Sequence, residues 1–174
     1  IEQPAPVANP VSATVAYGSS ANPTALNITG GAAYTDAHVD RFNPPPVRAP
    51  NDIVPSGTPL AFAPKWKFDV SANYRIRTNG PVDFALGAQT SYQSSQISLF
   101  VADPVQRAAG TIGAYSLTNL SVAILDSADR YRLTFQVRNL FDQSFSAAIA
   151  SGGPQGSFRY QIPRDADRYF GVTG

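Results

Sequence analysis

One group of side chains in this sequence has types and spacing that suggest metal binding. His38 is the single histidine, and Asp36 and Asp40 flank it at alternating positions, so the three side chains would share one side of an extended segment. A single imidazole, without a second histidine or a cysteine, is a poor ligand set for a transition metal. We therefore interpret residues 36–40 as a solvated strand end that enters a loop, and we expect no metal or other cofactor.

The remaining reactive residue types do not form a recognisable enzyme site. Serine is plentiful, but no Gly-x-Ser-x-Gly sequence is present, and the absence of cysteine excludes thiol nucleophiles and disulfides. The glycines of residues 152–156 lack the order of a dinucleotide-binding loop. Asp126, Asp129 and Asp142 lack calcium-loop spacing and fall at predicted turns. We predict that the protein is not an enzyme.

The most regular arrangement of charged residues lies between residues 65 and 93. From Trp66 to Ile76 every even position is apolar, whereas every odd position from Lys65 to Arg77 is polar or charged. Side chains in a strand alternate between its two faces, so this pattern predicts a strand with one apolar and one polar face. Asn79-Gly80 then predicts a tight turn, and residues 82–93 repeat the alternation.

The length of these two strands favours a membrane-spanning hairpin. Strands in soluble sheets usually have about 5 to 6 residues, whereas a tilted strand needs about 9 to 11 to cross a bilayer. The aromatic residues on the apolar face have the spacing of two girdles that bracket an apolar band: Trp66, Phe68, Tyr74, Phe84 and Tyr92. The alternative is a β-sandwich with one solvated face.

Composition limits the other possibilities. The 174 residues are 43% hydrophobic and 14% charged, which is too apolar for disorder. A formal net charge of +1 gives no basic surface, so nucleic acid is not an expected partner. The sequence contains no run of about 18 apolar residues, so no transmembrane helix is predicted. The chain starts at Ile1 without the pattern of a signal peptide, which indicates a processed chain or a fragment.

The whole chain is predicted to be all-β, an antiparallel up-and-down meander of about seven long strands. Residues 1–10 read as an irregular lead-in, and a hairpin is expected over residues 99–113. A bulge near Asn119 would reconcile the opposite parity of Tyr115 and Leu117 with that of residues 120–124. Short connections (19–24, 78–81, 126–129) alternate with long ones (40–60, 99–113, 142–167), as in outer-membrane barrels. Because the smallest closed barrels have about eight strands, we interpret residues 11–174 as part of a large transmembrane β-barrel.

Several short motifs follow one another in a characteristic order. They are Gly30-Gly31-Ala32-Ala33-Tyr34-Thr35-Asp36-Ala37, Ala63-Pro64 before an amphipathic strand, Asn139-Leu140-Phe141-Asp142 at a strand end, and Pro163-Arg164-Asp165 followed by Arg168-Tyr169-Phe170-Gly171-Val172. Over about residues 11–174 the sequence resembles the C-terminal third of TonB-dependent outer-membrane receptors. The resemblance implies a barrel of about 22 strands in the outer membrane of a Gram-negative bacterium. It also implies an N-terminal plug and the import of siderophores or other scarce nutrients.

The resemblance also implies partners and candidate site residues. Expected partners are outer-membrane lipid, the remaining barrel strands, the plug domain, the energy-transducing TonB complex acting through that plug, and an unidentified nutrient ligand. The plug lies outside this sequence, so the segment alone would not transport. Candidates for contact with the plug or ligand in the lumen are Lys65, Lys67, Asp69, Arg75, Arg77, Arg132 and Arg138. Loop location makes Arg48, Asp52, Arg107 and Gln155 candidates for extracellular ligand contact.

An open sheet of seven strands would leave unpaired backbone groups at both edges. Unpaired N–H and C=O groups are costly in lipid and attract further strands in water. We therefore expect either the remaining strands of the parent barrel or edge-to-edge self-assembly of copies to cover them. On the second alternative the chain would be a surface or secreted β-protein with a binding or structural role.

The alternation predicts opposite surroundings for neighbouring residues. Single cysteines at positions 68 and 69, each carrying a spin label, should report lipid at 68 and an aqueous or protein environment at 69. Accessibility to a lipid-soluble and a water-soluble relaxation agent measures the difference. Equal accessibility at both positions would contradict a membrane-spanning strand.

Overall fold

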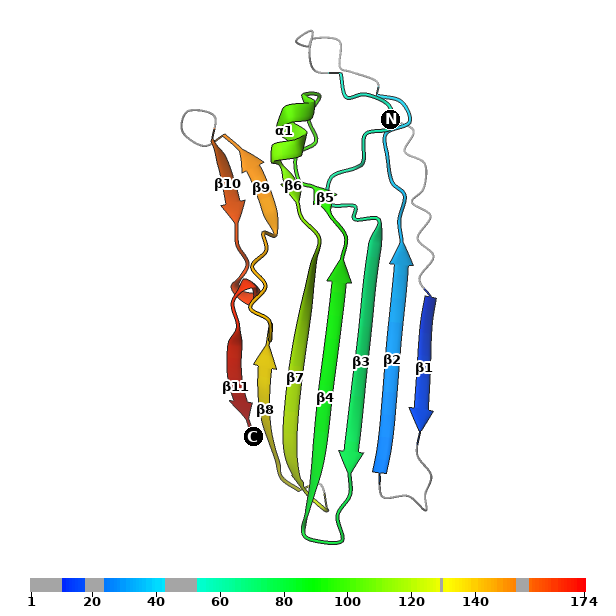
Figure 1. Cartoon of the computed structure of the whole chain (residues 1–174), viewed down its shortest axis with the longest axis vertical. Coiled ribbons are helices and arrows are strands. Elements are labelled where there is room, and N and C mark those ends of the chain that lie inside the picture. Colours follow the sequence, from blue (N-terminus) through cyan, green and yellow to red (C-terminus); the bar gives the residue numbers. More distant parts are fainter. Residues whose placement is uncertain (1–10, 18–23, 43–52, 129, 153–156) are drawn as a thin grey trace.

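The computed structural model describes residues 11–17, 24–42, 53–128, 130–152 and 157–174. Within these residues one antiparallel sheet contains seven strands in the order β1-β2-β3-β4-β7-β8-β11 (Figure 1). The strands are β1 Val11–Tyr17, β2 Thr24–Tyr34, β3 Trp66–Ile76, β4 Val82–Gln93, β7 Tyr115–Asp126, β8 Arg132–Arg138 and β11 Tyr169–Thr173. Each strand pairs with its predecessor in the sheet, which confirms the predicted meander. The lead-in at residues 1–10 lies outside the described residues.

The two ends of the sheet differ in how the strands are connected. At one end, called here the turn end, residues 77–81 join β3 to β4, and the next turn approaches it closely enough for Ser127 N to donate to Pro81 O at 3.0 Å. At the other, the loop end, long connections carry further elements (Figure 1). These are β5 Gln96–Ile97, α1 Pro104–Ala109, β6 Thr111–Ile112, β9 Ala148–Ser151, β10 Phe158–Gln161 and the 3₁₀ helix η2 Arg164–Ala166. Short and long connections are therefore sorted as predicted among the described residues.

The prediction of a simple hairpin over residues 99–113 is wrong. Only β5 and β6 pair there, and helix α1 lies between them. Asp103 caps that helix by accepting a hydrogen bond from Val105 N at 2.8 Å, and Pro104 occupies its first turn. Asp-Pro thus starts a helix here and does not form a turn, because proline needs no N–H partner in a first turn. None of the described helices is long and apolar enough to span a membrane.

The bulge predicted near Asn119 is also wrong. Strand β7 pairs with β4 without interruption from Tyr115 to Asp126. Tyr115 therefore shares a face with the polar Asn119 and stacks its ring on Phe145 at a centroid distance of 4.3 Å. An extra residue does occur, but at the end of β8. Leu140 N donates to Thr118 O at 2.8 Å, one residue out of the β7-β8 register.

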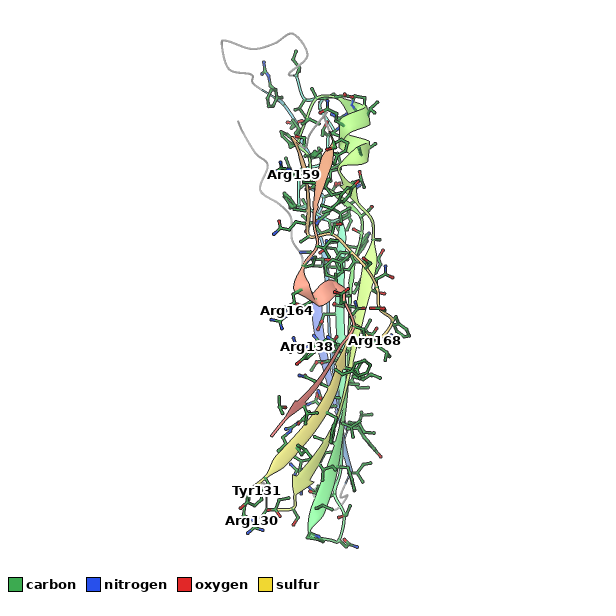
Figure 2. All side chains as sticks on the ribbon, turned by 90° about the vertical axis from the view of Figure 1, so that its left-hand side faces the viewer. Arg130, Tyr131, Arg138, Arg159, Arg164 and Arg168 are labelled. Atoms are coloured by element: carbon green, nitrogen blue, oxygen red, sulfur yellow. The ribbon has the colours of Figure 1, made fainter. Side chains whose placement is uncertain are left out.

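No second layer of described residues covers the apolar face of the sheet. The strands form a single layer with side chains on both sides (Figure 2). Val122 is 45% exposed and Phe135 is 46% exposed although both lie mid-strand. In a sandwich the opposite sheet would bury such residues. The uncovered face therefore favours contact with lipid over the sandwich alternative.

A small apolar core instead lies among the connections at the loop end. Its buried side chains come from three different connections: Val39, Val54, Leu99, Ile112 and Ile149. Ser98 ties two of these connections together, because its Oγ donates to Ile149 O at 2.7 Å and accepts from Ile149 N at 2.8 Å. The long connections therefore form an ordered rim on the sheet.

We expect the two faces to differ sharply in their tolerance of charge. Arginine at Phe135 should destabilise the folded protein by about 2 to 4 kcal/mol if that face meets lipid near midplane, whereas Arg138→Gln on the opposite face should cost little. Urea unfolding in lipid vesicles measures both free energies. Small and similar losses for the two variants would point to a solvated sheet.

Candidate lumen-facing site

The polar side chains of the sheet form rows across the strands on one face, called here the inner face. Partners in antiparallel strands lie directly opposite one another on the same face, so the register defines each row. One row contains Asn27, Asn73, Gly87, Ser121 and Gln136. The next row towards the loop end contains Thr29, Ser71, Gln89 and Asn119. The middle of the inner face is thus rich in amides and hydroxyls, and the residues of these two rows carry no formal charge.

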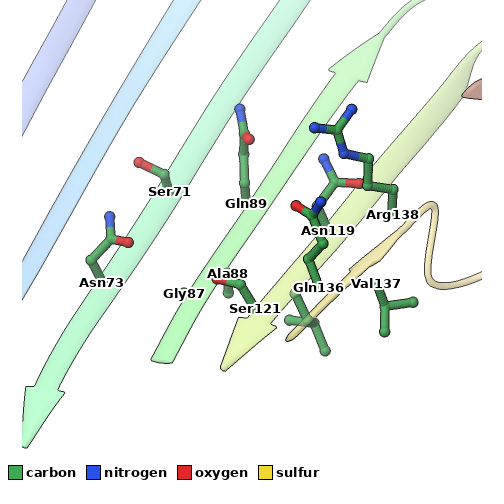
Figure 3. A pocket seen from close by; sticks show the side chains of 11 residues that line it. Ser71, Asn73, Gly87, Ala88, Gln89, Asn119, Ser121, Gln136, Val137 and Arg138 are labelled. Atoms are coloured by element: carbon green, nitrogen blue, oxygen red, sulfur yellow. The ribbon is translucent and has the colours of Figure 1, made fainter. Parts of the chain in front are cut away.

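A hollow of about 560 Å³ lies over these two rows and is called here the amide hollow. Figure 3 shows Ser71 and Asn73 on one side of it and Asn119, Gln136 and Arg138 on the other. Gly87 lies at the bottom of the hollow and contributes no side chain. A Cβ atom there would lie 3.3 Å from Asn73 Oδ1 and would collide with Ser121 Oγ.

A second hollow, of about 420 Å³, lies nearer the loop end of the inner face. Gly31 and Ala33 are the small residues of its lining, and Tyr115 and Leu117 contribute larger side chains. Lys67 and Asp69 supply the charged groups of the lining, and Gln89 Nε2 donates to Asp69 Oδ2 at 3.1 Å. Towards the loop end of the inner face, apolar and charged side chains therefore replace the amides and hydroxyls of the middle.

A buried carboxylate, that of Asp83, lies at the turn end of the inner face. Asp83 is only 3% exposed. Its Oδ2 accepts from Arg75 Nη2 at 3.2 Å, and its Oδ1 accepts from Thr78 N at 2.9 Å. Of the predicted lumen residues, Arg75 is therefore engaged in holding the β3-β4 turn. Arg77 follows the end of β3 and is exposed.

The other predicted lumen residues are distributed widely over the inner face. Arg138 lines the amide hollow. Arg132 lies at the start of β8, where its Nε donates to Thr134 Oγ1 at 3.2 Å. Lys65 precedes β3 at the loop end, with Nζ 3.7 Å from Asp36 Oδ1. The sheet brings Lys67 and Asp69 into one hollow but does not bring the set together as one cluster.

The predicted girdle residues all lie on the opposite, outer face. Tyr34, Trp66, Phe68 and Tyr92 form a continuous row of rings at the loop end, with successive centroids 4.6, 5.6 and 5.7 Å apart. Tyr74 and Phe84 lie on the same face nearer the turn end. Tyr34 was not among the predicted girdle residues, although its pairing with Trp66 places it in this row.

The loop candidates are only partly described. Arg48, Asp52 and Gln155 lie outside the described residues. Arg107 lies on α1, and its Nη1 donates to Val101 O at 2.7 Å and to Ala102 O at 2.9 Å. These bonds fix the guanidinium to its own loop.

The possible metal ligands are also at the loop end. His38 Nδ1 lies 3.7 Å from Asp36 Oδ1, and both side chains are about half exposed. Among the described residues, no group of three histidine or acidic side chains has the arrangement of a metal site.

The amide side chains at the centre of the inner face were not among the predicted site residues. Asn73, Gln89, Asn119 and Gln136 line the amide hollow. The strand register could not be read from the alternation alone, and only the register aligns these four residues into adjacent rows.

Comparison with known proteins identifies a family for this sheet. The family model described as "TonB dependent receptor-like, beta-barrel" matches residues 11–140. The searches of curated proteins and of solved structures gave no match. The matched region includes β1 to β8, and thus both the uncovered apolar face and the amide hollow. The chain belongs to the β-barrel family of TonB-dependent receptors, and its antiparallel strands are a segment of such an outer-membrane barrel.

Proposed function

We propose that this chain forms part of the wall of a receptor that imports a siderophore or another scarce nutrient across the outer membrane of a Gram-negative bacterium. The observation that carries the proposal is the contrast between the two faces of one sheet. The outer face has exposed apolar side chains and a row of aromatic rings, and the inner face has polar rows and hollows. Such a sheet fits between lipid and an aqueous or protein-filled lumen.

The amide hollow is proposed as a contact surface for the plug domain. Amide and hydroxyl groups can both donate and accept hydrogen bonds, so they can pair with polypeptide without burying an unpaired charge. The plug would in turn receive energy from the TonB complex.

Positively charged residues in the middle and at the loop end of the inner face are proposed to guide an anionic ligand. Lys67 and Arg138 line the two inner hollows, and Lys65 lies at the rim. Positive groups along a narrow lumen raise the local concentration of anions. Arg48, Asp52, Arg107 and Gln155 remain proposed ligand contacts in the extracellular loops.

Edge-to-edge assembly is a second proposal, supported by the exposed end of the sheet. Phe170 on β11 is 68% exposed, more than the apolar residues in the middle of the sheet. A further strand on that side would cover it, supplied either by the parent barrel or by another copy of the chain. The mass of the detergent-solubilised particle distinguishes the two sources.

Filling the amide hollow tests the role of the inner face. We expect Gly87→Val, made in the full-length receptor, to reduce uptake several-fold because the new side chain occupies the floor beside Ser121. Ala72→Val is the matched control, since Ala72 pairs with Ile28 and Ala88 on the outer face and does not line the hollow. Uptake of radiolabelled iron from a panel of ferric siderophores is the measurement.

The outcomes separate the parts of the proposal. Equal uptake by Gly87→Val and Ala72→Val would exclude a role for the hollow. No uptake of any ferric siderophore by the unmodified receptor would exclude siderophore import.

Removal of one positive charge tests ligand guidance. Arg138→Gln should lower the uptake rate of an anionic ligand at low ionic strength, with a smaller loss at high ionic strength because salt screens the charge. Initial rates at two salt concentrations measure this dependence. A loss that is independent of salt would contradict electrostatic guidance.

A further inference from the structure

Two motifs that carry the family resemblance meet at one point of the structure. Asn139 begins Asn139-Leu140-Phe141-Asp142 directly after β8, and η2 lies just before β11. Asn139 is only 2% exposed, and its backbone is left-handed with φ of 49°. A left-handed non-glycine residue whose amide is buried is unusual, and its side chain must have specific partners.

Asn139 joins three separate segments through its side chain and its backbone N–H. Its Nδ2 donates to Gln143 O at 3.1 Å and to Ala166 O at 3.0 Å, and its Oδ1 accepts from Gln143 N at 2.9 Å. Its own backbone N donates to Asn119 Oδ1 on β7 at 3.0 Å. The residue thus connects β7, the start of the long connection and the end of η2.

Asp142 adds a second connection to the same place. Its backbone is also left-handed, with φ of 54°, and its N donates to Asn139 O at 2.9 Å. Its Oδ1 accepts from Arg168 N at 2.9 Å, and Arg168 is the residue immediately before β11. Both side chains therefore hold the segment that leads into the last strand.

Strand β11 needs such a constraint because its pairing does not define its register strongly. It pairs with β8 over Tyr169–Thr173 and has no other partner in the described sheet. A one-residue slip would turn Phe170 and Val172 to the inner face, but a two-residue slip would leave both on the outer face. The alternation of side chains therefore does not exclude a two-residue slip.

The two motifs exclude that slip. A shift of two residues moves a strand by about 6.6 Å, which would break the bonds of Asp142 to Arg168 N and of Asn139 to Ala166 O. Gly171 acts in the same direction, since a Cβ atom there would lie 2.9 Å from the Tyr169 ring and 3.1 Å from Gln136 Nε2. After a two-residue slip, Tyr169 or Thr173 would face Gln136 in place of Gly171, and the Gln136 side chain would have to move.

We propose that Asn139 and Asp142 form a latch that docks β11 on β8 and sets its register. The latch is built from the connection itself, so it can form before any strand pairs with the free edge of β11. The role is separate from ligand import and does not depend on it.

Cysteine pairs on the outer face can read the register directly. Val172 lies opposite Phe135, so a V172C/F135C pair should form a disulfide in the full-length protein. V172C with L133C, or V172C with V137C, reports a slip of two residues in either direction. In the native register these two pairs are too far apart, because cysteines with Cα atoms more than about 7 Å apart cannot be bridged.

Variants of the latch should change which of the three cysteine pairs form disulfides. Asn139→Gly and Asp142→Gly each remove the side-chain bonds and still accept a positive φ. We expect each to reduce the 135–172 disulfide several-fold, with a slipped pair appearing or all three pairs lost. Asp142→Asn keeps an oxygen acceptor for Arg168 N and should restore the native pattern. Asp165→Ala, within η2, is the matched control and should leave it unchanged.

A pair elsewhere in the sheet completes the design. F68C/Y92C joins β3 to β4 and should form its disulfide in every variant. If the 135–172 disulfide persists at full yield in both glycine variants, the latch is refuted. If the 68–92 disulfide disappears with it, Asn139 and Asp142 support the whole sheet and the specific role at β11 is equally refuted.

Discussion

The hydrogen-bonded ladder between neighbouring strands is the interaction on which this molecule depends. It satisfies the backbone N–H and C=O groups within a single layer, so neither face needs a second layer to provide partners. A single layer in water would expose its apolar residues at a high cost, but lipid removes that cost and at the same time requires every backbone group to be paired. The exposed apolar side chains of β4, β7 and β8 follow from this arrangement.

The connections then determine where the ladder begins and ends. At the turn end, the buried carboxylate of Asp83 holds both Arg75 and the backbone of Thr78. At the loop end, Ser98 and Ile149 join two long connections around a small apolar core. Buried polar groups with complete sets of partners specify one geometry strongly. The sheet thus has a uniform middle and individually fixed ends.

The side chains of the inner face also change in type from the turn end of the sheet to the loop end. Its turn end holds the Arg75–Asp83 ion pair, its middle is rich in amides, and its loop end combines charges with aromatic and small residues. On the function proposed above, these zones would follow the lumen of the barrel from one mouth to the other. The amide-rich middle would then contact the plug, and the charged residues at the loop end would meet the ligand first.

The sequence alone determined the strands and, apart from the first residues of β7, their faces, because a period of two in side-chain polarity is a local property that survives in any register. It therefore predicted that Phe68 and Asp69 face opposite ways, and the short motifs indicated the family. It could not determine that Asn119 lies beside Gln89 and Ser121 beside Gly87, or that Asn139 reaches Ala166. Those relations depend on strand register and on chain segments that meet across long connections. They were decided only in the tertiary structure, where pairing between distant residues is fixed by hydrogen bonds that no local pattern encodes.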